Sequence, residues 1–144
     1  LEMRREVLSL CRRADLVIAA AAVCDWRFPS VATHKLKKTG RPMRLTMIPN
    51  PDIIREVALR RRARKGSAQV LVGFALETRG RLAAAREKLR RKGLDLIVAN
   101  GPDSLGAGRA KVSILGRLGR TRRLPVLSKD RVASAILSEA GRLL

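Results

Sequence analysis

Runs of apolar residues, separated by segments with helical periodicity, constrain the fold of this chain more than any other feature. The runs occupy residues 16–23, 69–76 and 94–100. Apolar runs without alternation are typical of strands buried on both faces, as in a parallel sheet covered by helices. Because helical segments lie between these runs, the sequence predicts an α/β fold with a Rossmann-like, three-layer open sheet that is mostly parallel.

The helical segments carry recognisable start and stop signals. Asn50 is the predicted N-cap of one helix, with Pro51 at its first position and Asp52 in its first turn. Thr78 and Ser128 are predicted N-caps of later helices, and Gly93 is the predicted stop of the one that Thr78 begins. The helical segments are therefore 2–14, 51–65, 79–92 and 129–143.

Apolar spacing within three of these helices predicts which residues face the core. The predicted inward residues are Met3, Val7, Leu8 and Cys11 in the first helix, Ile53, Ile54, Val57 and Ala58 in the second, and Val132, Ile136, Leu137 and Ala140 in the last.

The remaining segments predict loops and shorter strands. Residues 29–42 are polar and without periodicity, which predicts a flexible flap loop. Residues 44–49 alternate and predict a short strand, and residues 111–127 predict a C-terminal antiparallel hairpin. No repeat or linker divides the chain, so residues 1–144 are expected to form a single domain.

The charge of the chain makes an anionic partner plausible. Lys and Arg number 32 against 12 acidic residues, a net charge of +20. The bases are scattered over several segments, however, and the chain has only one Trp, two Phe and no Tyr. Few aromatic side chains are thus available to stack bases, and a dedicated nucleic-acid binder is not the favoured interpretation.

The apolar runs and cysteines argue against a membrane protein and a secreted one. The longest apolar run, 16–24, is far shorter than the roughly 20 residues of a membrane span. Cys11 and Cys24 have neither metal-ligand spacing nor the pattern of a disulfide framework. We therefore expect a cytoplasmic protein, with Cys24 a buried and inert thiol.

Several individual residues at strand ends and helix starts indicate a ligand site, because open α/β sheets bind ligands beyond the carboxyl ends of their strands. Asp25, Phe74 and Asn100 lie at such ends. Lys88 and Lys92, four residues apart, share one helix face. Taken singly, each has an ordinary alternative: a turn cap for Asp25, a core position for Phe74 and surface charge for the lysines. From the residues alone, the prediction is a basic α/β domain that binds an anionic ligand.

An ordered set of motifs is more specific than its members. The chain contains, in this order, "AAAVCDWR", "KLKK", "PNPDII", "VGFALET", "KLRRKGLDLIVAN" and "LPVLSKDRVASAIL". This succession closely resembles the phosphopantothenate–cysteine ligase domain of coenzyme A biosynthesis. The resemblance implies that the carboxylate of 4′-phosphopantothenate attacks the α-phosphate of CTP, with Mg²⁺ bound, and that cysteine then attacks the resulting acyl cytidylate.

The resemblance also implies roles for individual residues. Asp25 matches the nucleotide-binding aspartate of the family, and Lys35 matches the flap lysine that stabilises the acyl-nucleotide step and is counted here as catalytic. No protein ligands of the metal are identified. The residues expected to bind the nucleotide are Ala19, Ala20, Ala21, Asp25, Lys35, Pro51, Asp52, Ile53, Ile54, Phe74, Lys88 and Lys92.

Further expectations follow from the same resemblance. The family has a glycine-rich strand–loop–helix and an "N-x-S-S-G"-like segment that this chain does not match, so an upstream segment or another chain is expected to supply them. FMN is expected only if a decarboxylase domain is fused upstream. A homodimer is expected, and CTP is favoured over ATP. Two other hypotheses stay open: a degenerate nucleotide-binding or dimerisation module without catalysis, and a basic nucleic-acid-associated protein.

Overall fold

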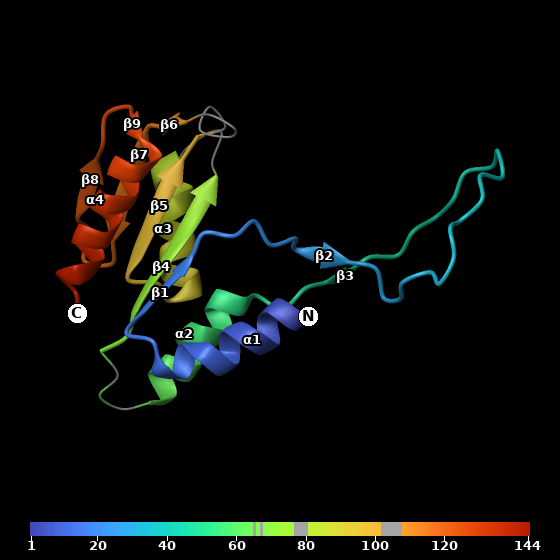
Figure 1. Cartoon of the computed structure of the whole chain (residues 1–144), viewed down its shortest axis with the longest axis horizontal. Helices are drawn as coiled ribbons and strands as arrows, with labels where there is room; N and C mark the ends of the chain where they lie inside the picture. The colour runs from blue at the N-terminus through green and yellow to red at the C-terminus, as the bar shows by residue number, and fades with distance from the viewer. Residues whose placement is uncertain (65, 67, 77–80, 102–107) are drawn as a thin grey trace. The chain divides into compact units, whose positions relative to one another are not determined.

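The computed structural model describes residues 1–64, 66, 68–76, 81–101 and 108–144, and its contacts divide the chain into two compact units (Figure 1). The sheet unit comprises Leu1–Ala20 and Ile53–Leu144, and the loop unit comprises Ala21–Asp52. The predicted N-cap Thr78 lies outside the described residues.

The sheet unit is built on a five-stranded sheet with the order β1-β4-β5-β7-β8. Strands β1, β4 and β5 are parallel, and β7 and β8 continue the sheet as an antiparallel hairpin. The predicted α/β sheet and its C-terminal hairpin are thus confirmed. The strands are β1 (Leu16–Ala19), β4 (Val70–Leu76), β5 (Leu96–Asn100), β7 (Val112–Gly116) and β8 (Thr121–Arg123), with a separate small pair of β6 (Arg109–Ala110) and β9 (Leu127–Ser128).

Helices cover both faces of this sheet and complete the predicted three layers. One core cluster joins the sheet to α1 (Glu2–Leu10), the 3-10 turn η1 (Cys11–Arg13), α2 (Ile53–Ala63) and α3 (Arg81–Lys92). The other joins the opposite face to α4 (Lys129–Gly141). Successive residues of β4 alternate between the two clusters, so that Leu71 belongs to the first and Val72 to the second. A strand buried on both faces has to be continuously apolar, which is why the sequence identified β4 and β5.

The prediction for the first strand is wrong in two respects. The strand ends at Ala19 rather than at residue 23, and it is half-buried rather than buried, with Ile18 39% exposed. The physical reason is its position: among the described strands β1 pairs with β4 alone, so it forms an edge of the sheet. From Ala21 onward the chain belongs to the loop unit.

The predicted start of α2 also needs correction. The helix begins at Ile53, and Asn50 is not its N-cap. The Asn50 side chain is used within the loop unit, where its amide donates to the carbonyl of Cys24 (2.8 Å) and its oxygen accepts from Arg27 (3.2 Å). The strand predicted over 44–49 is reduced to Ile48–Pro49.

Two predicted inward residues face solvent instead. Leu137 is 52% exposed, because α4 buries a narrow stripe at intervals of four residues, Val132, Ile136 and Ala140, and Leu137 lies beside it. Met3 is exposed near the start of α1, where burial begins only at Leu8. Two of the predicted helix signals are confirmed: the Ser128 hydroxyl accepts from the amide of Arg131 (3.4 Å), and Gly93 has a positive φ of 70° after α3.

An ion pair that is largely shielded from solvent links the amino ends of β4 and β5 to α2. The Arg61 guanidinium donates to the Asp95 carboxylate, to the carbonyl of Gln69 (2.8 Å) and to that of Gly93 (3.0 Å). The same carboxylate accepts from the amide of Leu71 (2.9 Å). Side-chain exposure is only 10% for Arg61 and 16% for Asp95. The Asp95 carboxylate therefore accepts hydrogen bonds from two elements, the Arg61 guanidinium of α2 and the Leu71 amide of β4.

A second carboxylate, that of Glu139, is buried on α4 and accepts hydrogen bonds from Arg122 (2.9 Å) and Arg142 (2.7 Å). The hydrogen bond from Arg122 lowers the pKa of Glu139 below its usual range; burial opposes this effect, and the charges of Arg142 and Arg120 assist it.

In the described parts of the chain, no helix combines the length and the apolar character needed to cross a membrane.

The lowered pKa of Glu139 predicts an acid-dependent contribution to stability. Because the folded-state pKa lies below the unfolded value, the contribution is present above the unfolded pKa of about 4.3 and is lost as the pH falls through the folded pKa. At pH 7, Glu139→Gln should lower the free energy of unfolding by about 1 kcal/mol, since both arginine partners are solvent-exposed. Urea unfolding at several pH values measures this difference, which should shrink toward zero in acid. The exposed Glu87→Gln is the control; a Glu139→Gln deficit that persists unchanged in acid would contradict the assignment.

Candidate functional site

The carboxyl edge of the sheet unit carries several of the predicted site residues. Strands β1, β4 and β5 are parallel and end at Ala19, Leu76 and Asn100, which therefore mark one edge of the sheet. Helix α2 begins at this edge, because Arg61, near its other end, reaches Asp95 at the amino end of β5. The start of α2 and the ends of these strands thus surround the place where an open α/β sheet binds a ligand.

Side chains at this edge differ in what they can offer a ligand. Phe74 is 37% exposed, since it lies on the α4 side of β4 beyond the part that α4 covers. Ala19 is half-buried and Ala20 exposed, whereas Ile54 is buried in the core and Ile53 half-buried. Phe74 is therefore available as an apolar wall. Ile54 anchors α2, and only its backbone remains for a ligand.

The two lysines of α3 lie on one face of that helix, as their spacing predicts. Both Lys88 and Lys92 are half-buried. Helix α3 runs back along the sheet, however, and Lys92 is its last residue, directly before Gly93 and the amino end of β5. Four residues of helix separate the two lysines by about 6 Å, so Lys88 is the nearer to the carboxyl edge.

The loop unit holds Asp25 directly before a short pair of antiparallel strands. Strands β2 (Trp26–Arg27) and β3 (Ile48–Pro49) pair antiparallel. The amide of Asn50 donates to the carbonyl of Asp25 (2.7 Å), and Arg27 donates to the carbonyl of Pro49 (2.8 Å). The backbone of Asp25 is thus fixed while its side chain stays exposed. Sequence reasoning missed this role of Asn50, because an Asn-Pro-Asp triplet is also an ordinary helix start.

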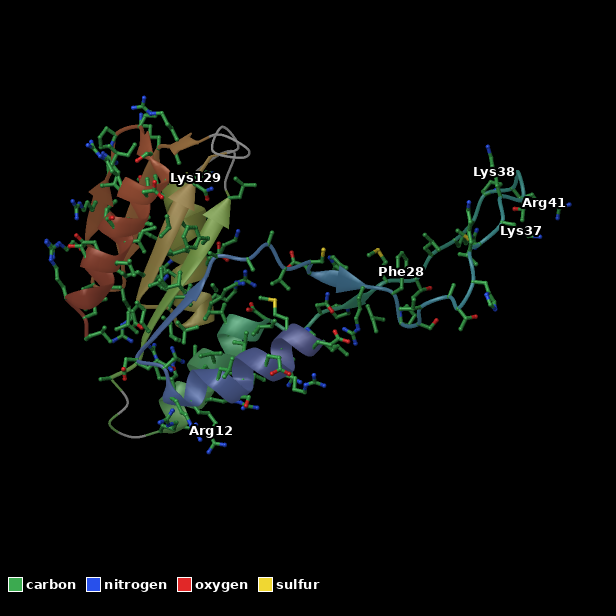
Figure 2. All side chains as sticks on the ribbon, viewed as in Figure 1. Arg12, Phe28, Lys37, Lys38, Arg41 and Lys129 are labelled. Carbon is green, nitrogen blue, oxygen red and sulfur yellow. The ribbon has the colours of Figure 1, made fainter. Side chains whose placement is uncertain are left out.

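Residues 28–47 of the loop unit form neither helix nor strand, and the predicted flap lies within this range. Lys35 is exposed here, and Figure 2 shows Lys37, Lys38 and Arg41 near the tip of the loop. Cys24 is exposed, which corrects the expectation of a buried thiol. The loop unit also exposes large apolar side chains: Val23, Trp26, Phe28, Val31, Leu36, Met43, Leu45 and Met47.

The predicted site residues are therefore divided between the units. The sheet unit contributes Ala19, Ala20, Ile53, Ile54, Phe74, Lys88 and Lys92, and the loop unit contributes Ala21, Asp25, Lys35, Pro51 and Asp52. Within the sheet unit, the structure brings four of these residues to the carboxyl edge: Ala19, Ile53, Ile54 and Phe74. It places Lys92 at the far end of α3.

A magnesium ion is expected to bind together with the nucleotide, without identified protein ligands. No group of three His, Cys, Asp or Glu side chains gathers for metal binding among the residues that the structure describes. Mg²⁺ needs no such cage, because it is commonly held by one or two carboxylates together with substrate phosphates and water. Asp25 and Asp52 are the two carboxylates in the sequence of the loop unit.

Comparison with known proteins gives this geometry a family context. Residues 1–143 match the family model described as "DNA/pantothenate metabolism flavoprotein C-terminal domain". The chain is 40% identical, over 146 aligned residues and 99% of its length, to the coenzyme A biosynthesis bifunctional protein CoaBC of Bacillus subtilis. It is 38% identical over 143 residues to the protein of the same name from Vibrio cholerae, covering 95% of the chain.

A solved structure agrees with these relatives. The C-terminal domain of coenzyme A biosynthesis bifunctional protein CoaBC superposes with a TM-score of 0.73 at 28% identity, covering 96% of this chain and 59% of that one. The chain spans about a third of the length of the curated relatives, 35% in both cases above. The match therefore concerns one part of larger proteins.

Proposed function

This chain belongs to the family of DNA/pantothenate metabolism flavoprotein C-terminal domains, and from that premise we propose that it serves the ligation of 4′-phosphopantothenate to cysteine in coenzyme A biosynthesis. The observation that carries the proposal is the family match over residues 1–143, together with 40% identity to a coenzyme A biosynthesis protein over nearly the whole chain.

The reaction proceeds in two steps. A carboxylate oxygen of 4′-phosphopantothenate attacks the α-phosphorus of CTP, and the bond to the pyrophosphate leaving group breaks. The amine of cysteine then attacks the acyl carbonyl, and CMP leaves with the electron pair of the broken acyl–oxygen bond. Because 4′-phosphopantothenate and CTP are both polyanions, the protein has to align the carboxylate with the phosphate and to offset the negative charge that gathers there.

The loop unit supplies two carboxylates, Asp25 and Asp52, and the flap lysine Lys35 to this proposal. The exposed side chain of Asp25 binds the nucleotide, and its fixed backbone supports this role by setting its position. Lys35, exposed in the flap, neutralises charge during formation and breakdown of the acyl cytidylate. Ala21, Pro51 and Asp52 line the nucleotide, and bound Mg²⁺ supplies charge neutralisation at the phosphates.

The sheet unit supplies the apolar walls of the proposed nucleotide site and two lysines. The exposed ring of Phe74 packs against the nucleotide, and the small side chains of Ala19 and Ala20 allow close approach to the backbone. Ile53 and Ile54 contribute main-chain groups at the start of α2, where amides favour an anion. Lys88 and Lys92 hold the nucleotide from α3, with Lys88 the stronger contributor because it lies nearer to the carboxyl edge.

The protein is further proposed to act as a homodimer in the cytoplasm and to use CTP in preference to ATP. The loop unit exposes eight large apolar side chains, Trp26 and Phe28 among them, and this supports a partner surface, because large exposed apolar areas are a feature of interfaces. The free thiols of Cys11 and Cys24 suit a reducing compartment.

Calorimetric titration with CTP and then ATP, in Mg²⁺, tests the proposal. We expect saturable binding of CTP, and Asp25→Asn should weaken it about tenfold or more, since a hydrogen bond to a charged group is lost. Asp15→Asn, an identical change at an exposed residue before β1, is the control and should bind CTP like the parent. Absence of CTP binding, or equal binding by Asp25→Asn, would contradict the assignment.

Turnover distinguishes a ligase from a binding module without catalysis. With all three substrates present, Lys35→Ala should slow CMP release about 100-fold, in line with the loss of a charge that stabilises a transition state. Lys38→Ala, a neighbouring exposed flap lysine, should remain near the parent rate. Comparable rates for the two variants would remove Lys35 from the mechanism.

A further inference from the structure

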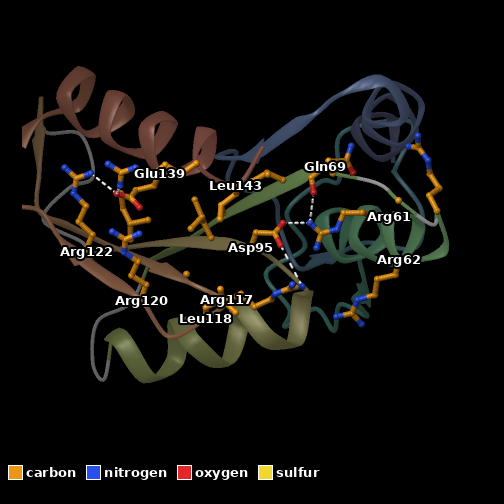
Figure 3. A pocket seen from close by; sticks show the side chains of 18 residues that line it. Arg61, Arg62, Gln69, Asp95, Arg117, Leu118, Arg120, Arg122, Glu139 and Leu143 are labelled. Carbon is orange, nitrogen blue, oxygen red and sulfur yellow. Dashed lines mark hydrogen bonds and ion pairs between the residues drawn. The ribbon is translucent and has the colours of Figure 1, made fainter.

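A pocket of about 640 Å³ opens at the amino edge of the sheet, the edge opposite the carboxyl ends of β1, β4 and β5 (Figure 3). It is lined by the end of α2, the starts of β4 and β5, the β7–β8 turn and the last turn of α4, all parts of the sheet unit. The volume lies within the range of about 300–1,000 Å³ that is typical of small-molecule sites. None of the residues used in the proposed reaction lines it.

The lining is strongly cationic. Seven arginines line the pocket against two carboxylates, Asp95 and Glu139. Six of these arginines come from two segments far apart in sequence, 60–64 and 116–123, whose basic character the proposed function does not explain. The fold brings them together, because α2 and the β7–β8 turn both end at the amino edge of the sheet. The arginines are Arg61, Arg62, Arg64, Arg117, Arg120, Arg122 and Arg142.

The two carboxylates leave much of this charge uncompensated. Asp95 binds Arg61 closely and lies 4.0 Å from Arg117, while Glu139 is shared by Arg122 and Arg142. In the described part of the chain, the guanidinium groups of Arg62 and Arg120 form no hydrogen bond or ion pair, although the charge of Arg120 acts on Glu139 from a distance. Each guanidinium has five N–H donors, so even the paired arginines keep donors for a ligand.

The arrangement of the pocket indicates what kind of anion fits. Figure 3 shows one cationic group around Asp95 and another around Glu139, with Leu143 between them. Buried side chains of Val70, Leu96 and Ile114 add apolar surface. Guanidinium groups match phosphate oxygens bidentately. A strand of nucleic acid is less well suited, because no aromatic side chain is found among the lining residues that the structure describes, and so none is present to stack bases.

We infer that this pocket is a second anion site, which binds a phosphorylated small molecule through Arg62, Arg117 and Arg120. Asp95 and Glu139 have a positioning role: they fix Arg61 and Arg122 at the two ends and so shape the pocket. The inference does not depend on the proposed ligase function, since the residues belong to the opposite edge of the sheet and are not shared with it.

Calorimetric titration with inorganic tripolyphosphate, without metal and at about 0.15 M salt, tests the inference; at that ionic strength, weak contacts between exposed charges are screened. The parent should bind saturably. The double variant Arg62→Ala/Arg120→Ala should bind about tenfold more weakly or worse, because it loses charge-assisted hydrogen bonds. The matched control, Arg91→Ala/Arg131→Ala, removes the same charge from exposed positions on α3 and α4 and should bind like the parent.

Each outcome is decisive. Weakening confined to the pocket variant, with thermal unfolding unchanged, supports the site. Equal weakening in both double variants shows that tripolyphosphate binding depends only on net charge, and this result overturns the proposed site. The absence of saturable binding also overturns it. Tighter binding of a single-stranded oligonucleotide than of tripolyphosphate, lost in the pocket variant, also overturns it, in favour of a nucleic-acid surface. Asp25→Asn should leave tripolyphosphate binding to the pocket intact, which separates this test from that of the proposed function.

Discussion

Replacing Asp95 by Ala is expected to lower the free energy of unfolding by about 3–5 kcal/mol, the usual cost of removing one partner of a buried ion pair. The substitution strands the Arg61 guanidinium, whose side chain is only 10% exposed, and removes the acceptor of the Leu71 amide. Since domains are stable by only about 5–15 kcal/mol, the loss should be a large part of the total. Urea unfolding followed by circular dichroism measures it.

A double-mutant cycle attributes this loss to the pair. Asp95→Ala combined with Arg61→Met should be less destabilised than the sum of the single variants by about 1–3 kcal/mol, because the second change removes the stranded charge. Asp95→Asn, which keeps an acceptor for the Leu71 amide, should lose less than Asp95→Ala. Strict additivity in the cycle would show that the two side chains do not interact, contrary to the geometry.

Replacing Leu71 by Ala is expected to cost about 3–5 kcal/mol through a different mechanism, the creation of a cavity. Leu71 is 0% exposed near the amino end of β4, in the cluster that includes Leu89, Ile97 and Leu115. The sheet is held on both sides of this strand by β1 and β5, so the surroundings have little freedom to collapse into the space. Thermal and urea unfolding of the variant measure the effect.

The same chemical change at Leu137 provides the control. Leu137 is exposed on α4, and Leu137→Ala should alter stability by less than about 0.5 kcal/mol, as surface substitutions usually do. The comparison also tests the corrected orientation of α4, because the sequence pattern alone placed Leu137 in the core. A loss at Leu137 similar to that at Leu71 would show that α4 buries a wider stripe than the structure has.

Much of the fold follows from local pattern. A strand covered on both faces has to be apolar at every position, so β4 and β5 were recognisable from their residues alone. Ser128 and Gly93 were predictable for the same reason, since a helix end requires a cap acceptor or a positive φ at a fixed place in the chain. The ordered motifs around Asp25, Lys35 and Phe74 predicted the family, and the family match confirms that prediction.

Other features depended on contacts between residues far apart in sequence. Whether an apolar run lies at the centre or the edge of a sheet is decided by the strands beside it, and this is why 16–23 was predicted too long and too buried. The Asn50 side chain could cap a helix or form hydrogen bonds within a loop. Its spatial neighbours Cys24 and Arg27 offer the hydrogen-bond partners of the loop, and the side chain bonds to these.

By itself, then, the sequence determined the α/β order of elements, the start of α4 at Ser128, the end of α3 at Gly93, and the family. Only the tertiary structure decided which charges lie together. It assembled Arg61 with Asp95, Arg122 with Glu139, and two distant arginine segments into one pocket. The reason is physical: periodicity and capping act over a few residues of chain, whereas the pairing of charges depends on where helices and strands end in space.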